Sequence, residues 1–536
     1  MWDFIIIGAG PTGLTLAWFL RNLGPEIKIL VIERENSIGG CHRVKRVNGL
    51  FTEHGPRIYL DNYRTFIALL KDMGLDFNQF FTPYKFSQSD ILKYIRNLSI
   101  GETLTLAGAF IRLLFNPEYG QNITVLQFLQ KHQFSKESIN YITRLCLLTD
   151  GGLIDRYPLK TFLEIINQNS LYNIYQPNFS NDRHLWSKVK QKITDSGDGN
   201  RGDGDRGDGD RGDGDKQVTF LLETEIYQIL NQGNRVRGVM TNNGKIYYGK
   251  KVLGAIPPAN LGLILAKSNL PIREAFGDFN RLKKWIEYTK YATYIPIIFY
   301  FPKIELPLEW GVPASDWGIA SIVLSDYNRD LPGTVISTCI SLPNAISSVT
   351  KLTANQTPDS QQLINETLRQ LREIYRKDST DRKDSPEPLH AIISPGINYD
   401  SIQKQYQTND NAYFQTILGV LPPSTVDNFQ SIGPHNGKSD YSFTSLESAV
   451  ENAYMYLREN YHITVKHLKP DRLWTIRDFL LISLVIFIIG VMVIVILIKP
   501  LIGNEIDLFS SINLSKNSIV IFLCIVTITL AFILGK

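Results

Sequence analysis

Cysteine is scarce in this sequence, and no long stretch of basic residues interleaved with aromatic ones is present. The 536 residues include four cysteines, which lie far apart and never form a CxxC pair: Cys41, Cys146, Cys339 and Cys524. This spacing argues against a disulfide framework, predicts no metal site, and is typical of a reducing compartment. The formal charge of +4, without basic residues interleaved with aromatic ones, also argues against nucleic acid as a partner.

Long uncharged runs are confined to the C-terminus. Residues 479–498 carry no charge, and at about 1.5 Å per residue they could cross a hydrocarbon core of roughly 30 Å. A second, slightly shorter run occupies 519–534. Basic residues crowd the linker at 463–478, so the positive-inside rule predicts a cytosolic N-terminal part. We therefore predict a multi-pass protein with a lipid membrane as partner, which would be a host or virion membrane if the chain is viral.

A glycine motif stands between a predicted strand and a predicted helix at the N-terminus. The apolar run 4–7 is followed by Gly8, Gly10, Pro11, Thr12 and Gly13, and the apolar run 29–32 is followed by Glu33. The first glycine permits a tight turn, the second lets backbone amides approach a pyrophosphate, and the third lets helix and strand pack closely. The Glu33 carboxylate can accept hydrogen bonds from an adenosine ribose. The motif predicts a dinucleotide-binding domain.

The periodicity changes several times beyond residue 63. Residues 64–194 have helical spacing, and the repeat of glycine and aspartate at 195–216 has nothing apolar to bury, so we expect disorder there. Short strands are predicted at 218–222, 226–230, 236–241, 245–248 and 251–256. Residues 261–404 are rich in aromatic and β-branched residues and indicate a second sheet. Residues 429–433 have the pattern of a strand, and Thr444 to Glu447 that of a capping box opening a helix.

Several segments resemble the group of flavin amine oxidases, protoporphyrinogen oxidases and phytoene desaturases. They are Glu33 followed by Ser37-Ile38-Gly39-Gly40, then Gly49-Leu50-Phe51, Glu53-His54-Gly55-Pro56-Arg57, Thr224-Glu225-Ile226 and residues 252–258. In that group the dinucleotide is FAD, the paired glycines lie along its diphosphate and ribityl chain, and the turn at Gly55 lies near the isoalloxazine ring. No cysteine lies in the last soluble segment, so the resemblance implies noncovalent FAD.

The resemblance and the glycine motif together give a set of cofactor-binding residues. They are Gly8, Gly10, Pro11, Thr12, Gly13, Glu33, Arg34, Gly39, Gly40, Gly55, Pro56, Arg57, Glu225, Ile226, Gly433, Ser445, Leu446 and Glu447. Cys41 stands where the group has an arginine, and His42 and Arg43 are the candidates to replace it. No catalytic residue is predicted, and four aromatic residues are interpreted as core rather than as a substrate cage: Tyr294, Tyr300, Trp310 and Trp317.

The fold class that follows is α/β, with a Rossmann-type FAD-binding domain, a discontinuous α+β substrate domain and a C-terminal transmembrane helical hairpin. The FAD-binding domain would comprise residues 1–63, 217–260 and 405–462. The substrate domain would comprise a helical part at 64–194 and a sheet with a helix at 261–404. Residues 195–216 would be an insertion.

The predicted function is a membrane-anchored FAD-dependent oxidoreductase. It would transfer hydride to flavin from a small-molecule substrate, either an amine or a lipophilic, unsaturated compound. Because only one dinucleotide fingerprint is visible, oxygen or another diffusible acceptor would reoxidise the flavin. Two alternatives stay open: a flavoprotein like UDP-galactopyranose mutase, which uses reduced flavin without net redox chemistry, and an inactive membrane-tethered scaffold with the same fold.

Overall fold

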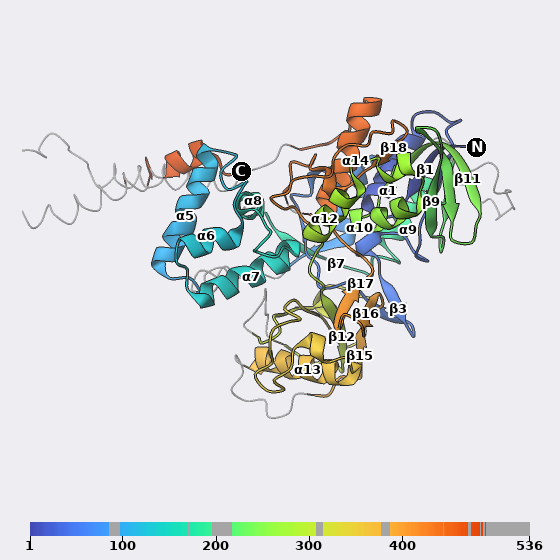
Figure 1. Ribbon diagram of the computed structural model, residues 1–536. Coiled ribbons are helices and arrows are strands. Elements are labelled where there is room, and N and C mark those ends of the chain that lie inside the picture. The colour runs from blue at the N-terminus through green and yellow to red at the C-terminus, as the bar shows by residue number, and fades with distance from the viewer. Residues whose placement is uncertain are drawn as a thin grey trace, which may run out of the picture.

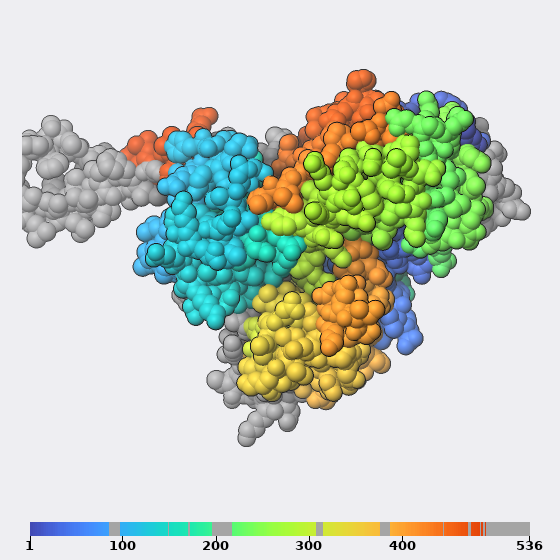
Figure 2. Space-filling view, viewed as in Figure 1, coloured from blue at the N-terminus to red at the C-terminus, as the bar shows by residue number. Residues whose placement is uncertain are grey.

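The computed structural model describes residues 1–84, 97–169, 172–195, 217–306, 315–376, 386–442, 444–469, 473–482, 484, 485 and 488. Three parts are visible in Figure 1: a domain built on a large sheet, a group of helices, and a domain built on a smaller sheet. Figure 2 shows the smaller sheet domain, in yellow, below the other two. The predicted insertion, apart from Asp195, and Trp310 lie outside the described residues.

The large sheet joins strands from distant parts of the chain. They are β1 (Trp2–Ile7), β2 (Ile29–Ile32), β8 (Val218–Leu221), β9 (Ile226–Gln232), β10 (Arg235–Thr241), β11 (Ile246–Gly254) and β18 (Phe429–Ser431). The order is β8-β2-β1-β11-β10-β9, with β18 also paired to β11. β8, β2, β1, β11 and β18 run parallel, whereas β9 and β10 form an antiparallel hairpin with β11. The predicted Rossmann-type sheet is confirmed.

Residues 246–254 form one strand rather than the two that the sequence predicted. Strand β11 continues through Gly249, which pairs with Trp2 of β1. A Cβ atom at Gly249 would lie 2.8 Å from Ile5 Cδ1. Glycine therefore lets the two strands approach each other here and does not interrupt β11.

Helices cover both faces of the large sheet. Ile6 and Val31 pack in the core cluster that includes α1 (Pro11–Arg21), α2 (Arg64–Asp72), α9 (Leu185–Thr194) and α14 (Leu446–Tyr461). Ile5 and Leu30 point to the opposite cluster, with α10 (Pro258–Lys267), α11 (Leu270–Arg273) and α12 (Phe279–Thr289). Because both faces are covered, both sets of alternating side chains are apolar.

The smaller sheet is antiparallel and has the order β13-β14-β12-β15. Its strands are β12 (Ile295–Phe301), β13 (Ile319–Val323), β14 (Thr334–Ile340) and β15 (His390–Ile393), and α13 (Ser360–Arg376) packs on it. Nearby lie the hairpins of β3 (Lys45–Val47) with β4 (Leu50–Thr52) and of β16 (Ile397–Asp400) with β17 (Gln405–Thr408). The 3-10 turns are η1 (Gly40–His42), η2 (Leu324–Asp326), η3 (Ala354–Gln356) and η4 (Pro434–Asn436).

The helical part contains α5 (Ile100–Phe115), α6 (Val125–Lys131), α7 (Lys136–Asp150) and α8 (Leu159–Asn169). The side chains of Ser99, Thr124 and Ser135 cap the first three of these helices, as expected for N-cap residues that accept from orphan N–H groups. A small sheet of β5 (Tyr59–Leu60), β6 (Phe81–Pro83) and β7 (Ile174–Pro177), with α3 (Phe77–Phe80), connects this part to the large domain.

The prediction of a membrane-spanning protein is corrected by the described residues. Among them, no helix combines the length and the apolarity needed to cross a membrane. After Trp474, helical residues are described without interruption only over 476–482, which is shorter than the roughly 20 residues of a span. The rest of the predicted spans at 479–498 and 519–534 lies outside the described residues, apart from 484, 485 and 488.

The start of α14 differs from the predicted capping box. Ser445 is the N-cap and accepts from Ser448 N. Glu447, which is 1% exposed, turns away from its own helix and accepts from Thr65 N at 2.7 Å and Phe66 N at 2.9 Å. These are orphan donors in the first turn of α2, where a negative charge is favoured. Glu447 therefore caps a neighbouring helix and joins two segments that lie far apart in the chain.

We expect Glu447→Ala to lower the free energy of unfolding by about 3 kcal/mol, because two buried N–H groups lose their acceptor and a cavity forms. The matched control is Glu459→Ala on the same helix, where the carboxylate pairs with Lys438 at the surface; we expect a change below about 1 kcal/mol. Urea denaturation followed by circular dichroism measures both. Equal effects of the two substitutions would contradict the capping role.

Candidate functional site

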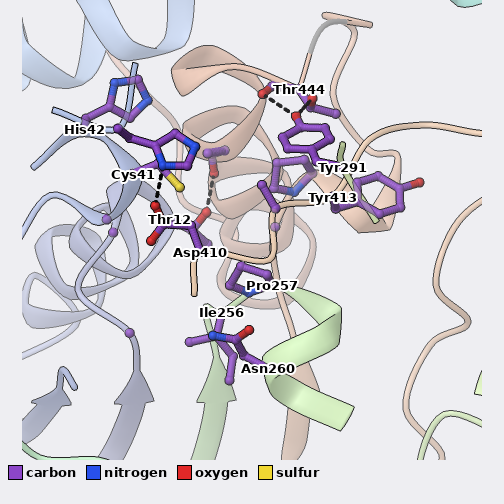
Figure 3. A pocket seen from close by; sticks show the side chains of 18 of the residues that line it. Thr12, Cys41, His42, Ile256, Pro257, Asn260, Tyr291, Asp410, Tyr413 and Thr444 are labelled. Atoms are coloured by element: carbon purple, nitrogen blue, oxygen red, sulfur yellow. Dashed lines mark hydrogen bonds and ion pairs between the residues drawn. The ribbon is translucent and has the colours of Figure 1, made fainter. Parts of the chain in front are cut away.

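A cavity of about 490 Å³ lies where the three parts of the chain meet. Ile7 and Ile32, the last residues of β1 and β2, line it. It therefore begins at the carboxyl ends of parallel strands, where open α/β sheets bind ligands. The helical part contributes Asp150 and the smaller sheet contributes Ser321 to the same wall. In Figure 3, Asn260 lies at one end of the drawn site and Tyr291 and Thr444 lie at the other.

The end near Asn260 is lined by the turn between β8 and β9. Glu225 and Ile226, both predicted from the resemblance, lie in the wall with Thr224. Asn242 N donates to the Glu225 carbonyl at 2.9 Å, which fixes this turn against the hairpin of β10 and β11. The wall at this end thus offers backbone groups of an ordered strand edge.

The turn between β1 and α1 requires glycine because of its protein neighbours. Gly8 has φ +101°, and a Cβ atom there would lie 2.6 Å from Ala255 O. A Cβ atom at Gly13 would lie 2.0 Å from Gly8 O. These close approaches place the first turn of α1, including Thr12, at the cavity wall, where its free N–H groups favour an anion.

Gly10 and Gly55 face the cavity instead of a protein neighbour. Gly10 has an extended backbone that any residue adopts, and a Cβ atom there would meet nothing closer than Gly40 Cα at 3.5 Å. At Gly55 the nearest atom is Cys339 Cβ at 3.9 Å. Since both glycines line the cavity, a side chain at either would occupy ligand space. The wall is therefore shaped for close approach of a ligand to the backbone.

Glu33 is held at the wall by hydrogen bonds to its own neighbourhood. Its Oε2 accepts from Ala9 N at 2.8 Å and its Oε1 from Glu35 N at 3.0 Å. Arg43 Nη2 lies 3.8 Å from Oε1. The side chain is buried and lines the cavity, so its remaining acceptor capacity is directed at whatever the cavity binds.

Two half-buried arginines line the cavity, and each has one buried side-chain nitrogen without a hydrogen-bond partner in the described part of the chain. Arg43 Nε donates to Gly40 O at 2.8 Å, and its Nη1, 3.6 Å from Glu35 Oε2, has no hydrogen-bond partner in the described part of the chain. Arg57 donates from Nη2 to Cys41 O, and its buried Nε likewise has none there. Buried cationic donors without acceptors favour an anionic ligand. The residues present thus fit a dinucleotide with a diphosphate.

His42 differs from Arg43, the other candidate to replace the missing arginine. His42 Nδ1 lies 3.1 Å from Tyr59 OH, and burial lowers the pKa of His42 well below its ordinary value. It is therefore neutral at pH 7. Arg43 is the one of the two that brings positive charge to the wall.

The end of the cavity near Tyr291 contains a buried carboxyl group. Asp150 accepts from Tyr157 OH at 2.7 Å and from Thr444 N at 2.9 Å, and burial raises its pKa to about 7. Tyr294, interpreted as core from the sequence, lines the cavity here. Trp317 lies in the core of the smaller sheet, and Tyr300 is buried in a separate apolar cluster with Ile298 and Val335.

Most of the predicted cofactor residues line this one cavity: Gly8, Gly10, Thr12, Glu33, Arg34, Gly40, Gly55, Pro56, Arg57, Glu225, Ile226, Gly433, Ser445 and Leu446. Pro11, Gly13, Gly39 and Glu447 are not in its wall. Gly13 is needed for the contact with Gly8, and a Cβ atom at Gly39 would lie 2.6 Å from Trp186 Nε1. Glu447 caps α2.

Sequence reasoning missed the polar and aromatic residues that close the cavity: Asp150, Tyr291, Asp410, Tyr413, His435 and Thr444. Asp410 pairs with His54 at 2.6 Å, which ties the loop after β17 to the turn at Gly55. Their partners are distant in the sequence and form no motif. The only local signal is the glycine pair after Asp150, at the end of a predicted helix.

Comparisons with known proteins agree with this fold. A model of the NAD(P)-binding Rossmann-like domain family matches residues 6–73. Coproporphyrinogen III oxidase of Staphylococcus aureus (strain NCTC 8325 / PS 47) is 41% identical over 71 residues, which are 13% of this chain and 15% of that protein. UDP-galactopyranose mutase of Mycoplasma pneumoniae (strain ATCC 29342 / M129 / Subtype 1) is 31% identical over 105 residues, 16% of this chain and 25% of that protein. The chain thus matches a quarter or less of the length of these curated relatives.

Solved structures are similar over most of the chain. An oxidoreductase from Methanosarcina mazei has a TM-score of 0.57 at 13% identity, covering 85% of this chain and 100% of that one. A putrescine oxidase bound to putrescine has a TM-score of 0.55 at 11% identity, covering 86% and 99%. The chain has the fold of these solved structures. The predicted resemblance is therefore confirmed at the level of this fold.

Gly13 packs against protein atoms, whereas Gly10 faces the cavity, so we expect substitution by alanine to have different effects at the two positions. Gly13→Ala places a Cβ atom against Gly8 O, and we expect it to cost about 3 kcal/mol of stability or more. Gly10→Ala should leave the free energy of unfolding within about 1 kcal/mol of the wild type. It should nevertheless weaken binding of a dinucleotide at least about tenfold, because the added methyl group occupies ligand space in the cavity. Thermal denaturation measures the effect on stability, and a ligand titration measures the effect on binding. Unimpaired binding by the Gly10 variant would contradict the role of Gly10 in the ligand site.

Proposed function

We propose that this chain is an FAD-dependent oxidoreductase that binds its cofactor noncovalently and oxidises a small-molecule substrate. The observation that carries the proposal is the cavity that extends from the glycine turn of β1 and Glu33 to an end lined by residues of the helical part and of the smaller sheet. Its first part fits a dinucleotide. Its far end, walled by a second domain, is where a substrate would meet the reactive part of the cofactor.

The roles of the residues follow from their places in the wall. Glu33 would accept hydrogen bonds from ribose hydroxyls, and the N-terminus of α1 with Arg43 would neutralise the diphosphate. FAD, when bound, supplies an acceptor for hydride. Tyr291 and Tyr294 close the far end and would exclude water from the reacting atoms, which strengthens electrostatic interactions there.

Noncovalent binding is supported by the thiols of the wall. Cys41 and Cys339 line the cavity, and burial raises the pKa of Cys41 to about 11 and that of Cys339 to about 12. Both are therefore protonated near neutral pH, and a protonated thiol is a poor nucleophile. A thioether to the cofactor is not expected.

The alternative of a mutase without net redox chemistry has one observation in its favour, the similarity to UDP-galactopyranose mutase over 105 residues. The two proposals differ in what the purified holoprotein does. An oxidoreductase is reduced by its substrate. A mutase-like protein binds a uridine nucleotide and is active only after its flavin has been reduced.

We expect the full purified chain to show the absorption bands of oxidised flavin, and acid denaturation to release all of it as FAD. Glu33→Gln should weaken FAD binding about tenfold or more, because one of the two acceptor oxygens of the carboxylate is replaced by an NH2 group, which can only donate. Bleaching of the flavin band during substrate screening would support the oxidoreductase. A folded, colourless protein that does not bind added FAD would refute the cofactor assignment and favour an inactive scaffold.

A further inference from the structure

Asp150 is the centre of a buried hydrogen-bonded cluster at the far end of the cavity. It ends helix α7 and is 3% exposed. Oδ2 accepts from Tyr157 OH at 2.7 Å, and Oδ1 accepts from Thr444 N at 2.9 Å, from Tyr291 OH at 3.4 Å and from the Thr444 hydroxyl. Three separate segments of the chain thus converge on one carboxyl group, and both its oxygens are bonded.

The cluster is open to the cavity on one side only. Asp150, Tyr291 and Thr444 line the wall, whereas Tyr157 is fully buried behind them. The hydroxyls of Tyr291 and Thr444 are hydrogen-bonded to each other (Figure 3). A continuous chain of hydroxyl groups therefore leads from the cavity surface to the carboxyl group. Because a hydroxyl both donates and accepts, such a chain can pass a proton.

Packing holds these groups in place. Tyr291 stacks on Phe414 with ring centroids 5.6 Å apart, and Tyr157 contacts the same ring from 6.3 Å. Gly151 follows Asp150 with φ +64°, and a Cβ atom there would lie 3.3 Å from the Tyr291 ring and 3.0 Å from Tyr294 OH. The glycine thus permits the close approach of both tyrosines to the end of α7.

Asp150 is surrounded by groups that stay neutral near pH 7. Burial raises its pKa to about 7, against the hydrogen bonds from Thr444 and Tyr157, which act in the opposite direction. Burial also raises the pKa of each thiol or phenol that interacts with it electrostatically: Cys146 on its own helix, Tyr157, Tyr291, Tyr294 and Tyr413. In this cluster Asp150 is thus the group able to exchange a proton at physiological pH.

We propose that Asp150 exchanges, through the hydroxyls of Tyr291 and Thr444, the proton that accompanies two-electron oxidation of the substrate. The inference rests on the proposed function. With FAD bound, the flavin would accept the hydrogen of the broken substrate C–H bond together with both electrons, as hydride. An X–H bond on the neighbouring N, O or C atom breaks, a C=X bond forms, and the proton becomes the O–H proton of Asp150. The substrate must therefore carry a releasable proton on the atom next to the oxidised carbon.

The test measures protons and needs no substrate. The midpoint potential of the bound FAD is determined against pH by equilibration with redox dyes, for the wild-type holoprotein and for Asp150→Asn. Above about pH 7, reduction of the wild type should take up about one more proton per two electrons than the variant, because negative charge added to the cavity on reduction would favour protonation of the ionised carboxylate. Equal proton uptake in two FAD-bound proteins overturns the inference and leaves the proposed function intact.

A second variant keeps the proposal testable if Asp150→Asn fails to fold. Tyr157→Phe removes a donor to Oδ2 behind the cavity wall, so it should raise the proton affinity of Asp150 about tenfold. The break in the plot of potential against pH should then move about one unit higher. A purely structural cluster would lose stability without moving this break, and an unmoved break overturns the proposal. A wild-type chain that binds no FAD would refute the proposed function itself.

Discussion

The close contact between the first turn of α1 and the end of β1 determines much of this structure. Only glycine at position 13 allows that contact, since a Cβ atom would lie 2.0 Å from Gly8 O. The contact brings Thr12 to the wall of the cavity, and the Thr12 hydroxyl donates to Ala449 O of α14 at 3.0 Å. Helix α14 in turn presents Glu447 to the first turn of α2. The ligand wall and the packing of the C-terminal helix thus share one steric requirement.

Buried carboxyl groups connect the parts of the chain that build the cavity. Glu33 closes the turn around Ala9 within the large domain. Asp150 of the helical part accepts from Thr444, just before α14. Glu447 joins α14 to α2. In each case backbone N–H groups satisfy a charge or a potential charge that burial would otherwise make costly. These groups add specific polar links to an apolar core that the large sheet shares with the helical part.

The parts of the fold that were predictable from the sequence are those whose partners are close in the chain. The glycine turn, Glu33 and the strands that include the apolar runs 4–7 and 29–32 follow local spacing. The role of Glu447 was not predictable, because the same pattern fits a cap on its own helix and its real partner is 382 positions away. Asp150 carries no motif, and Thr444, 294 positions away, was predicted only as part of a helix cap. The prediction of membrane spans rested on composition, and among the described residues no helix meets the requirement.

The discontinuity of the large sheet has a consequence during protein synthesis. Strand β11 pairs on one side with β1 and on the other with β10 at residues 246–248 and with β18 at residues 252–254. Until the ribosome has made β18, the edge of β11 at residues 252–254 stays open and can pair with other chains. The hydrogen bond from Thr12 to Ala449 spans 437 positions, so α1 also cannot complete its packing until α14 has been synthesised. Such long-range closure makes folding slow and exposes incomplete chains to aggregation. A nascent chain that stops short of α14 would therefore be a natural target for chaperones.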